Sequence, residues 1–132
     1  MNTHREDLIY RDECFKIVGV LFSVYKELGG SLLEKYYQKA LALAFKKTGI
    51  KFTEQFPVKL YFEKELIGKF FIDFLIEIRD AKIVLEIKKH ENFGLKNIDQ
   101  VKSYLKALNL QLGILANFTH SGVKFKRIVH LT

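Results

Sequence analysis

The sequence predicts an α/β domain in which helices flank a central mixed β-sheet. Residues 70–89 alternate apolar and polar side chains with the two-residue period of β-strands, and three other segments repeat apolar residues at helical spacing. The third of these helices lies between that strand pair and a further apolar strand, residues 111–118. A helix that links strands in this way implies mixed pairing, and therefore the α/β class.

Length and composition indicate one domain. The chain has 132 residues, a hydrophobic fraction of 48% and 12 Phe, which is ample for one core, so we expect residues 1–132 to form a single domain. The apolar runs are too short to span a bilayer and Met1–Arg11 is polar, so we expect neither a signal peptide nor a membrane segment. Lone Cys14 cannot form an internal disulfide, which is typical of the reducing cytoplasm.

The chain is basic. Its 22 Lys and Arg residues against 15 Asp and Glu residues give a formal net charge of +7. This balance is compatible with nucleic acid, with an anionic membrane or with an acidic partner. Acids gathered at a metal site would leave the remaining surface more positive still.

Two helices are expected before the strands. The first, residues 12–28, carries an apolar stripe and is broken by Gly29-Gly30, and the second runs from Ser31 to Thr48. Glu34 then has two interpretations, which do not exclude each other. In a capping box, Ser31 caps the helix and Glu34 reaches back to the backbone. Alternatively, Glu34 points toward the polar patch described below, with Tyr37 one turn further along the same face.

Strands follow the second helix. Residues 51–56 alternate, and Pro57 interrupts them, which indicates an edge strand or a bulge. Residues 58–62 continue the pattern up to a charged turn at 63–65. Gly68 marks a bend or bulge before the central hairpin.

The central hairpin carries apolar side chains on one face of its first strand. These are Phe70, Ile72, Phe74, Ile76 and Ile78. If Arg79-Asp80 is a two-residue loop, Asp73 on the other face lies opposite Glu86; if the loop is Asp80-Ala81, Asp73 lies opposite Lys88, one diagonal step from Glu86. Both registers gather Asp73, Glu86 and Lys88 on one side, whereas a three-residue loop without a bulge would separate them.

Two carboxylates and a lysine on one patch have two explanations. The simpler one is an exposed sheet face with a solvated ion pair. Against it, the strands are strongly apolar, and a partly buried carboxylate pair repels itself unless a cation lies between the two groups. Oxygen ligands of this kind suit Mg²⁺, and Lys88 would then hold an attacking water or offset charge on a phosphate.

The rest of the chain completes the fold. A loop over residues 90–96 contains His90, which beside Glu91 is more typical of a solvated residue than of a metal ligand. The helix 97–108 follows, with Gln100 and Tyr104 together on the shoulder of its apolar face; on spacing alone they are a polar pair at the rim. Residues 111–118, QLGILANF, indicate a buried strand, and residues 123–129 alternate apolar and basic, as in a half-exposed strand.

These residues resemble a known catalytic pattern. Asp73, followed by Glu86-Ile87-Lys88, resembles the D…E-x-K signature of the PD-(D/E)XK nuclease superfamily, although Ile72 replaces its proline. Gln100 and Tyr104 resemble a Q-x-x-x-Y element found on the following helix in members related to recombination helicase–nucleases. Glu34 stands where such nucleases carry an acidic residue on the first core helix.

A closer resemblance is to the GxxExxY proteins, a small family of that superfamily. The similar segments run from Leu28 to Val129 and therefore cover most of the chain. They are Leu32-Leu33-Glu34, Tyr37, the strand around Asp73, the E-x-K, LGILANF and KRIV. The glycine of the family name falls at Ser31, which leaves a helix cap intact.

The resemblance implies a restriction-endonuclease-like core and a nuclease dependent on Mg²⁺ or Mn²⁺. Asp73 and Glu86 would bind the ion together with the backbone carbonyl of Ile87, and Lys88 would orient the attacking water. Glu34 would hold a metal-bound water or a second ion. The remaining residues expected to support the site or contact DNA are Tyr37, Gln100 and Tyr104.

The expected partner is nucleic acid, with DNA favoured and selected by structure because no base-reading element is evident. A homodimer is compatible with the resemblance, since small nucleases of the superfamily often dimerise. Two other functions stay open. One is a non-catalytic nucleic-acid-binding or protein-interaction module, and the other is a structural domain in which Asp73 and Lys88 form an ion bridge.

Overall fold

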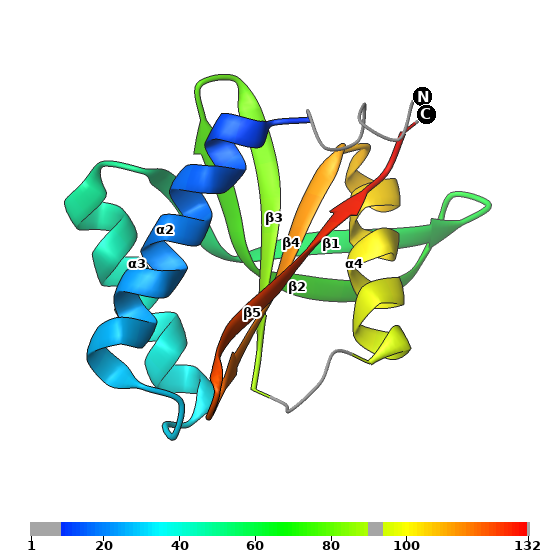
Figure 1. Ribbon diagram of the computed structural model, residues 1–132. Helices are drawn as coiled ribbons and strands as arrows, with labels where there is room; N and C mark the ends of the chain where they lie inside the picture. Colours follow the sequence, from blue (N-terminus) through cyan, green and yellow to red (C-terminus); the bar gives the residue numbers. More distant parts are fainter. Residues whose placement is uncertain (1–8, 90–93, 132) are drawn as a thin grey trace, which may run out of the picture.

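The computed structural model of the protein describes residues 9–89 and 94–131. One five-stranded sheet, with its strands in chain order, forms the centre of the fold (Figure 1). The strands are β1 (Lys51–Phe62), β2 (Glu65–Ile78), β3 (Ala81–Lys88), β4 (Leu112–Thr119) and β5 (Gly122–Val129). The helices of the described residues are α2 (Arg11–Leu28), α3 (Glu34–Thr48) and α4 (Leu95–Leu108).

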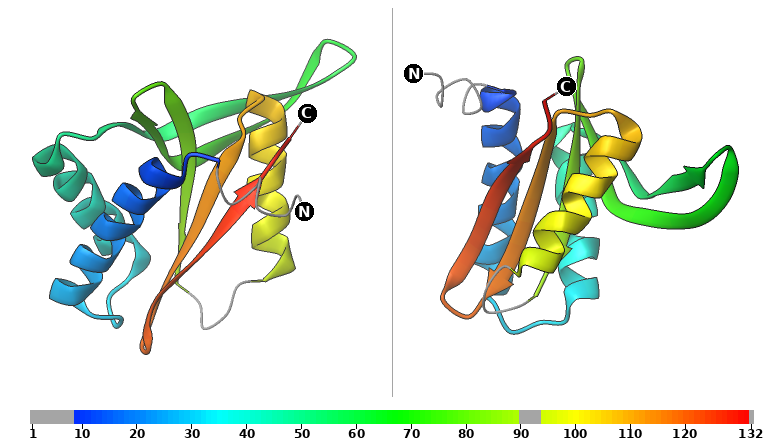
Figure 2. Two further views of the ribbon diagram at one scale, coloured as in Figure 1. Left: turned by 45° about the horizontal axis from the view of Figure 1, so that its top comes forward. Right: turned by 90° about the vertical axis from the view of Figure 1, so that its right-hand side faces the viewer.

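Helices cover both faces of the sheet, α2 and α3 on one and α4 on the other (Figures 1 and 2). The central pair β3–β4 is parallel and is joined through α4, while every other neighbouring pair is antiparallel. The prediction of an α/β fold with a mixed sheet is therefore confirmed. Within the described ranges, no helix is long and apolar enough to cross a membrane.

The second helix begins three residues later than expected. Its first residue is Glu34, and Leu33 precedes it without a capping side-chain hydrogen bond, so the predicted capping box is wrong. The reason lies in tertiary packing. The Tyr37 hydroxyl donates to the Gly29 carbonyl at 2.5 Å and accepts from the Leu32 N–H at 3.2 Å, which holds this segment as a loop.

The hairpin of β1 and β2 is one long, continuous ribbon. Pro57 does not interrupt β1, because β1 is an edge strand and Pro57 needs no hydrogen bond on its free side. Glu63 and Lys64 form the turn with φ of 46° and 69°. The predicted irregularity at Gly68 is confirmed, since the register shifts opposite it, between Leu60 and Tyr61.

One expectation for β2 is wrong. Its even-numbered apolar residues do not share one face: Phe74 packs in the cluster beneath α2 and α3, whereas Ile72 packs with Val58 in the cluster beneath α4. The hairpin bends between these two positions, where Gln55 on β1 adopts a φ of 50°. The bend sends the outer part of the hairpin past α4 (Figure 2), and it lies at Asp73.

The C-terminal elements agree with the sequence pattern to within two residues. α4 begins at Leu95 and keeps the predicted end at Leu108, and β4 and β5 follow as the predicted strands. His90 lies outside the described residues.

Candidate active site

The turn between β2 and β3 fixes the position of the predicted site. Ile78 pairs with Ala81, so the loop is Arg79-Asp80, the first of the two registers considered, with Arg79 at a φ of 56°. Continued along the strands, this register sets Asp73 opposite Glu86. Lys88 reaches the same place, with its Nζ 4.0 Å from Glu86 Oε2.

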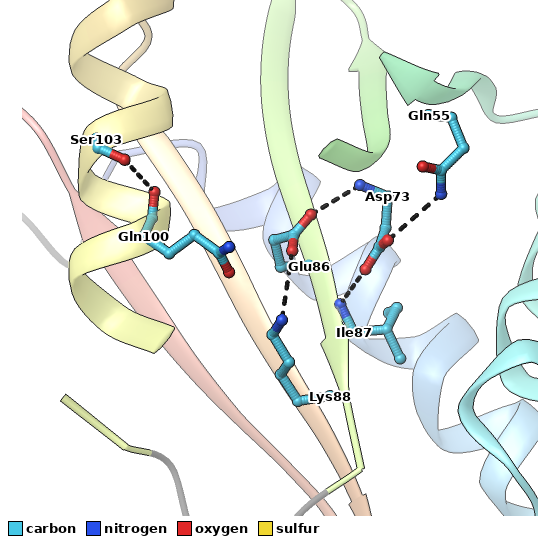
Figure 3. Close-up of polar contacts among 7 residues, drawn as sticks. All are labelled: Gln55, Asp73, Glu86, Ile87, Lys88, Gln100 and Ser103. Carbon is cyan, nitrogen blue, oxygen red and sulfur yellow. Dashed lines mark hydrogen bonds and ion pairs between the residues drawn. The ribbon is translucent and has the colours of Figure 1, made fainter. Parts of the chain in front are cut away.

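Asp73 and Glu86 lie where the sheet opens. The last paired residues of β2 and β3 are Phe74 and Leu85. Beyond this pair, backbone N–H groups donate to carboxylate oxygens instead of backbone carbonyls. The Asp73 N–H donates to Glu86 Oε1 at 2.7 Å, and the Ile87 N–H donates to Asp73 Oδ2 at 2.8 Å (Figure 3). The two acids thus brace the point at which β2 bends away from β3.

The environment of both carboxylates disfavours two negative charges. Burial raises the pKa of Asp73 above its ordinary value, against the opposing effects of the Ile87 N–H and Lys88. Burial and the charge of Asp73 together raise the pKa of Glu86 to about 8, and Glu34 adds to the rise. Lys88 lowers both pKa values but balances only one charge. The pair therefore has a deficit of positive charge.

The oxygen atoms that remain fit a hard divalent cation. Asp73 Oδ1 has only a long contact to Gln55 Nε2, at 3.5 Å, and Glu86 Oε2 faces Lys88 at 4.0 Å. In an extended strand the N–H and C=O of one residue point to the same side, so the Ile87 carbonyl also faces the gap left by β2. Two carboxylates and a carbonyl suit Mg²⁺ or Mn²⁺ with water completing the coordination. In the described part of the chain, no three His, Cys, Asp or Glu side chains gather as ligands.

Glu34 lies close enough to the pair for its charge to contribute to the raised pKa of Glu86. It is the first residue of α3 and is half-buried. It is not a third member of a compact ligand group with Asp73 and Glu86. From this position Glu34 can act on the Asp73–Glu86 pair only through a water molecule or a second ion.

Tyr37 does not reach the surface. It is fully buried and stacks on Phe118 with ring centroids 4.3 Å apart and an interplanar angle of 9°. Its hydroxyl ties the loop before α3, as described above. Because a buried ring cannot touch DNA, only the supporting role fits Tyr37, and it acts on the loop that leads into Glu34.

Gln100 and Tyr104 approach the site from α4. The side chain of Gln100 is directed toward Glu86 and Lys88 (Figure 3). Tyr104 is buried, and burial together with the charges of Glu86 and Asp73 raises its pKa to about 12. Tyr104 therefore stays a neutral wall of the site, whereas Gln100 is accessible to a ligand.

Two polar residues near the site were missed by the sequence reasoning. Gln55 contacts Asp73 across the bent strands. The sequence indicated a bend or a bulge at Gly68 without deciding between them, so it did not fix the one-residue shift of the β1–β2 register that sets Gln55 against Asp73. Asn117 lies beside Lys88 in the parallel pair and is fully buried. A polar residue within the apolar run 111–118 was the signal that could have identified it.

Comparison with known proteins adds a family and a fold. A family model described as the PD-(D/E)XK nuclease superfamily matches residues 11–128. A solved structure titled "Crystal structure of SSO0001" superposes with a TM-score of 0.63 at 18% identity, over 97% of this chain and 63% of that one. The chain thus spans less than two thirds of that protein, and the likeness concerns the fold. A search of curated proteins gave no match.

Proposed function

Because the chain belongs to the PD-(D/E)XK nuclease superfamily, we propose that it hydrolyses phosphodiester bonds with a divalent ion bound at Asp73 and Glu86. The observation that carries the proposal is the opening of the sheet at this pair. Buried Glu86 and half-buried Asp73 face one lysine there, and both acids have raised pKa values. A buried charge deficit of this kind is costly unless a cation binds, so it indicates a functional site.

Mg²⁺ or Mn²⁺ is the cofactor of this proposal, with Asp73, Glu86 and the Ile87 carbonyl as its ligands. When bound, such an ion supplies Lewis-acid stabilisation and alignment for in-line displacement at phosphorus. Lys88 donates a hydrogen bond to the attacking water and offsets negative charge on the phosphate. Water forms the new P–O bond, and the leaving oxygen departs from the opposite side and takes up a proton.

The surrounding residues position these groups. Glu34 holds a water molecule or a second ion at the first turn of α3. Gln100 extends from α4 toward Lys88 and contacts either the lysine or the substrate backbone. Tyr104 and Tyr37 exclude water and brace the elements that carry Gln100 and Glu34.

Within the superfamily we assign the chain to the GxxExxY proteins. The support comes from the order of its motifs, from Leu32-Leu33-Glu34 and Tyr37 through the E-x-K to LGILANF. The glycine of the family name is replaced by Ser31. Ser31 lies before α3 and forms no helix cap, so the presence of serine instead of glycine at this position leaves the catalytic groups unchanged.

We propose that the protein is cytoplasmic and that its substrate is DNA, selected by its structure rather than by its sequence. The net charge of +7 supports a polyanionic substrate, and buried, reduced Cys14 is compatible with the cytoplasm. A homodimer that cuts two strands is part of the proposal. A panel of single-stranded, duplex, flapped and four-way DNA with Mg²⁺ or Mn²⁺ tests it. Metal-dependent cleavage that disappears in Lys88→Ala is the expected result, and cleavage that survives the change would exclude this site.

A second candidate is a nucleic-acid-binding module without turnover. It is favoured by one observation: one oxygen of each carboxylate already accepts a hydrogen bond from a backbone N–H. Titration calorimetry with Mg²⁺ and Mn²⁺ distinguishes the two. Binding that is lost in Asp73→Asn supports the nuclease, whereas DNA binding without metal binding or cleavage supports the module.

A further inference from the structure

The outer part of the β1–β2 hairpin, residues 56–72, extends from the sheet as a two-stranded arm (Figures 1 and 2). Its inner face packs against α4: Val58 and Ile72 are buried there, and the ring of Phe70 lies 6.0 Å from that of Tyr104. The opposite face carries Phe71, Lys59 and Lys69, which are all exposed. We call these three residues the outer strip.

The outer strip begins beside the catalytic aspartate. β2 is extended from Lys69 to Ile72, so Lys69 and Phe71 project to the side opposite buried Ile72, and the strand then reaches the bend at Asp73. At about 3.3 Å per residue, Phe71 is about 7 Å and Lys69 about 13 Å along the strand from Asp73. A nucleic-acid chain of a few nucleotides that leaves Asp73 along β2 therefore passes both side chains.

The charges of the outer strip are unbalanced. Lys59 and Lys69 are directly opposite each other in the register, an arrangement of like charges that destabilises a hairpin. Neither lysine forms an ion pair with any residue that the structure describes. The pair Lys51–Glu77, nearer the body of the same ribbon, shows the usual arrangement, with 3.8 Å between nitrogen and oxygen. Two facing lysines are suited to a phosphate of a ligand.

Phe71 adds a stacking surface. Its side chain is half-exposed, at 50%, although it lies in the middle of a strand, and Lys69 Nζ lies 5.2 Å from the centre of its ring. An exposed aromatic ring beside cations is the combination that binds single strands, because bases stack on the ring while lysines hold the backbone. A duplex, whose bases are already stacked, cannot use the ring in this way.

We propose that the outer strip binds a single strand of nucleic acid on its way to or from Asp73, with a base on Phe71 and a phosphate between Lys59 and Lys69. This inference rests on the proposed function for its direction, because the strand is the one whose phosphate reaches Lys88. A second copy of the chain fits the strip less well. Two-fold pairing of this face would bring four lysines together on proteins that each carry a net charge of +7.

The test measures binding without cleavage. Fluorescence anisotropy with labelled single-stranded oligothymidine and a duplex of equal length, in EDTA and over a range of salt, gives the affinity of each variant. We expect Lys59→Gln/Lys69→Gln to weaken single-strand binding about tenfold and to reduce the salt slope by about 0.7, the value for one phosphate contact. We expect Phe71→Ala to weaken it roughly tenfold with an unchanged slope.

The matched control is Lys16→Gln/Lys26→Gln, which removes the same charge from exposed positions on α2, a helix that packs on the body of the sheet and not on the arm. It should leave single-strand affinity within about twofold. Equal losses in the control and the strip variant would overturn the inference, because net charge alone would explain them. The inference would also be overturned if the strip variants lost as much affinity for the duplex as for the single strand, or if Phe71→Ala lost no affinity for the single strand.

The outcome is separable from that of the proposed function. Cleavage of bis-p-nitrophenyl phosphate, which is too small to span from Asp73 to the arm, reports on the catalytic site alone. Strip variants should retain this activity while their KM for oligonucleotides rises. If the natural chain cleaves but its single-strand affinity is the same in the strip variants, only the inference is rejected. If binding depends on the strip but the natural chain never cleaves, only the nuclease is rejected. Circular dichroism melts confirm that each variant is folded.

Discussion

The backbone N–H of Asp73 donates a hydrogen bond to Oε1 of Glu86, with 2.7 Å between the two atoms. In a regular hairpin the acceptor at this position would be a backbone carbonyl. The reciprocal bond from the Ile87 N–H to Asp73 Oδ2 completes the exchange. Each carboxylate is therefore held by the strand that carries the other, so both are oriented before any ligand binds, which is the preorganisation that a catalytic site requires.

This arrangement predicts different effects for two lysines of one strand. Lys88→Ala should reduce metal-dependent cleavage by at least about 10²-fold, because it removes the cation nearest to Glu86 and to the phosphate. Lys82→Ala, an exposed position at the other end of β3, should leave the rate within about twofold. Initial rates at saturating metal are the measurement. An equal decrease in both variants would mean that general charge, not the site, governs cleavage.

The raised pKa of Glu86 predicts a pH-dependent stability in EDTA. Its ordinary value is 4.5, and in the folded chain it is about 8. The folded protein thus keeps a proton that the unfolded chain releases, so this stabilisation is complete below pH 4.5 and is lost as the pH rises through about 8. Urea unfolding should give a free energy of unfolding that falls over this window in the natural chain and falls much less in Glu86→Gln.

The control for this experiment is Glu65→Gln, at an exposed position next to the hairpin turn. The free energy of unfolding of this variant should fall with pH as steeply as that of the natural chain. A residual slope in Glu86→Gln is expected, because the pKa of Asp73 is also raised. A Glu86→Gln protein with the full slope would contradict the assigned burial of that carboxyl group.

The sequence predicted those features of the fold that depend on local pattern. The periodic helices and strands were correct, and the hairpin register was one of two options, because loop length limits how strands can pair. The position of Asp73, Glu86 and Lys88 on one side followed from that register. The hydrogen bonds between the carboxylates and the backbone could not be predicted from the register, because they exist only where β2 leaves β3.

The features that the sequence did not predict depend on contacts distant in the chain. The capping box at Ser31 was plausible locally, but Tyr37, whose ring stacks on Phe118 of β4, holds the preceding loop, and the helix begins only at Glu34. The bend at Asp73 places Ile72 under α4, and alternation along β2 contains no sign of it. Local rules therefore locate the strands of the candidate site but not the surfaces that surround them.

Tyr37→Phe tests the loop before α3. The change keeps the ring on Phe118 but removes the hydroxyl that bonds Gly29 and Leu32. Because buried backbone groups lose their partner, the free energy of unfolding should fall by about 1–3 kcal/mol in urea titrations. The adjacent change Tyr36→Phe, on a ring that is 47% exposed, should stay within about 0.5 kcal/mol. A neutral Tyr37→Phe would show that the loop is held by packing alone.

The same loop depends on the absence of a side chain at Gly30. A Cβ there would lie 2.0 Å from the Thr119 carbonyl oxygen, a backbone atom at the end of β4 that also accepts a hydrogen bond from Tyr25. Gly30→Ala should therefore destabilise the protein by about 1–3 kcal/mol, because the backbone must move to accept one methyl group. Gly19→Ala, at an exposed position in α2 with nothing within 4 Å of the added carbon, should instead stabilise it by about 0.5–1 kcal/mol. Thermal unfolding of the two variants in parallel should give shifts of opposite sign, and a stabilised Gly30→Ala would contradict the close contact between this loop and β4.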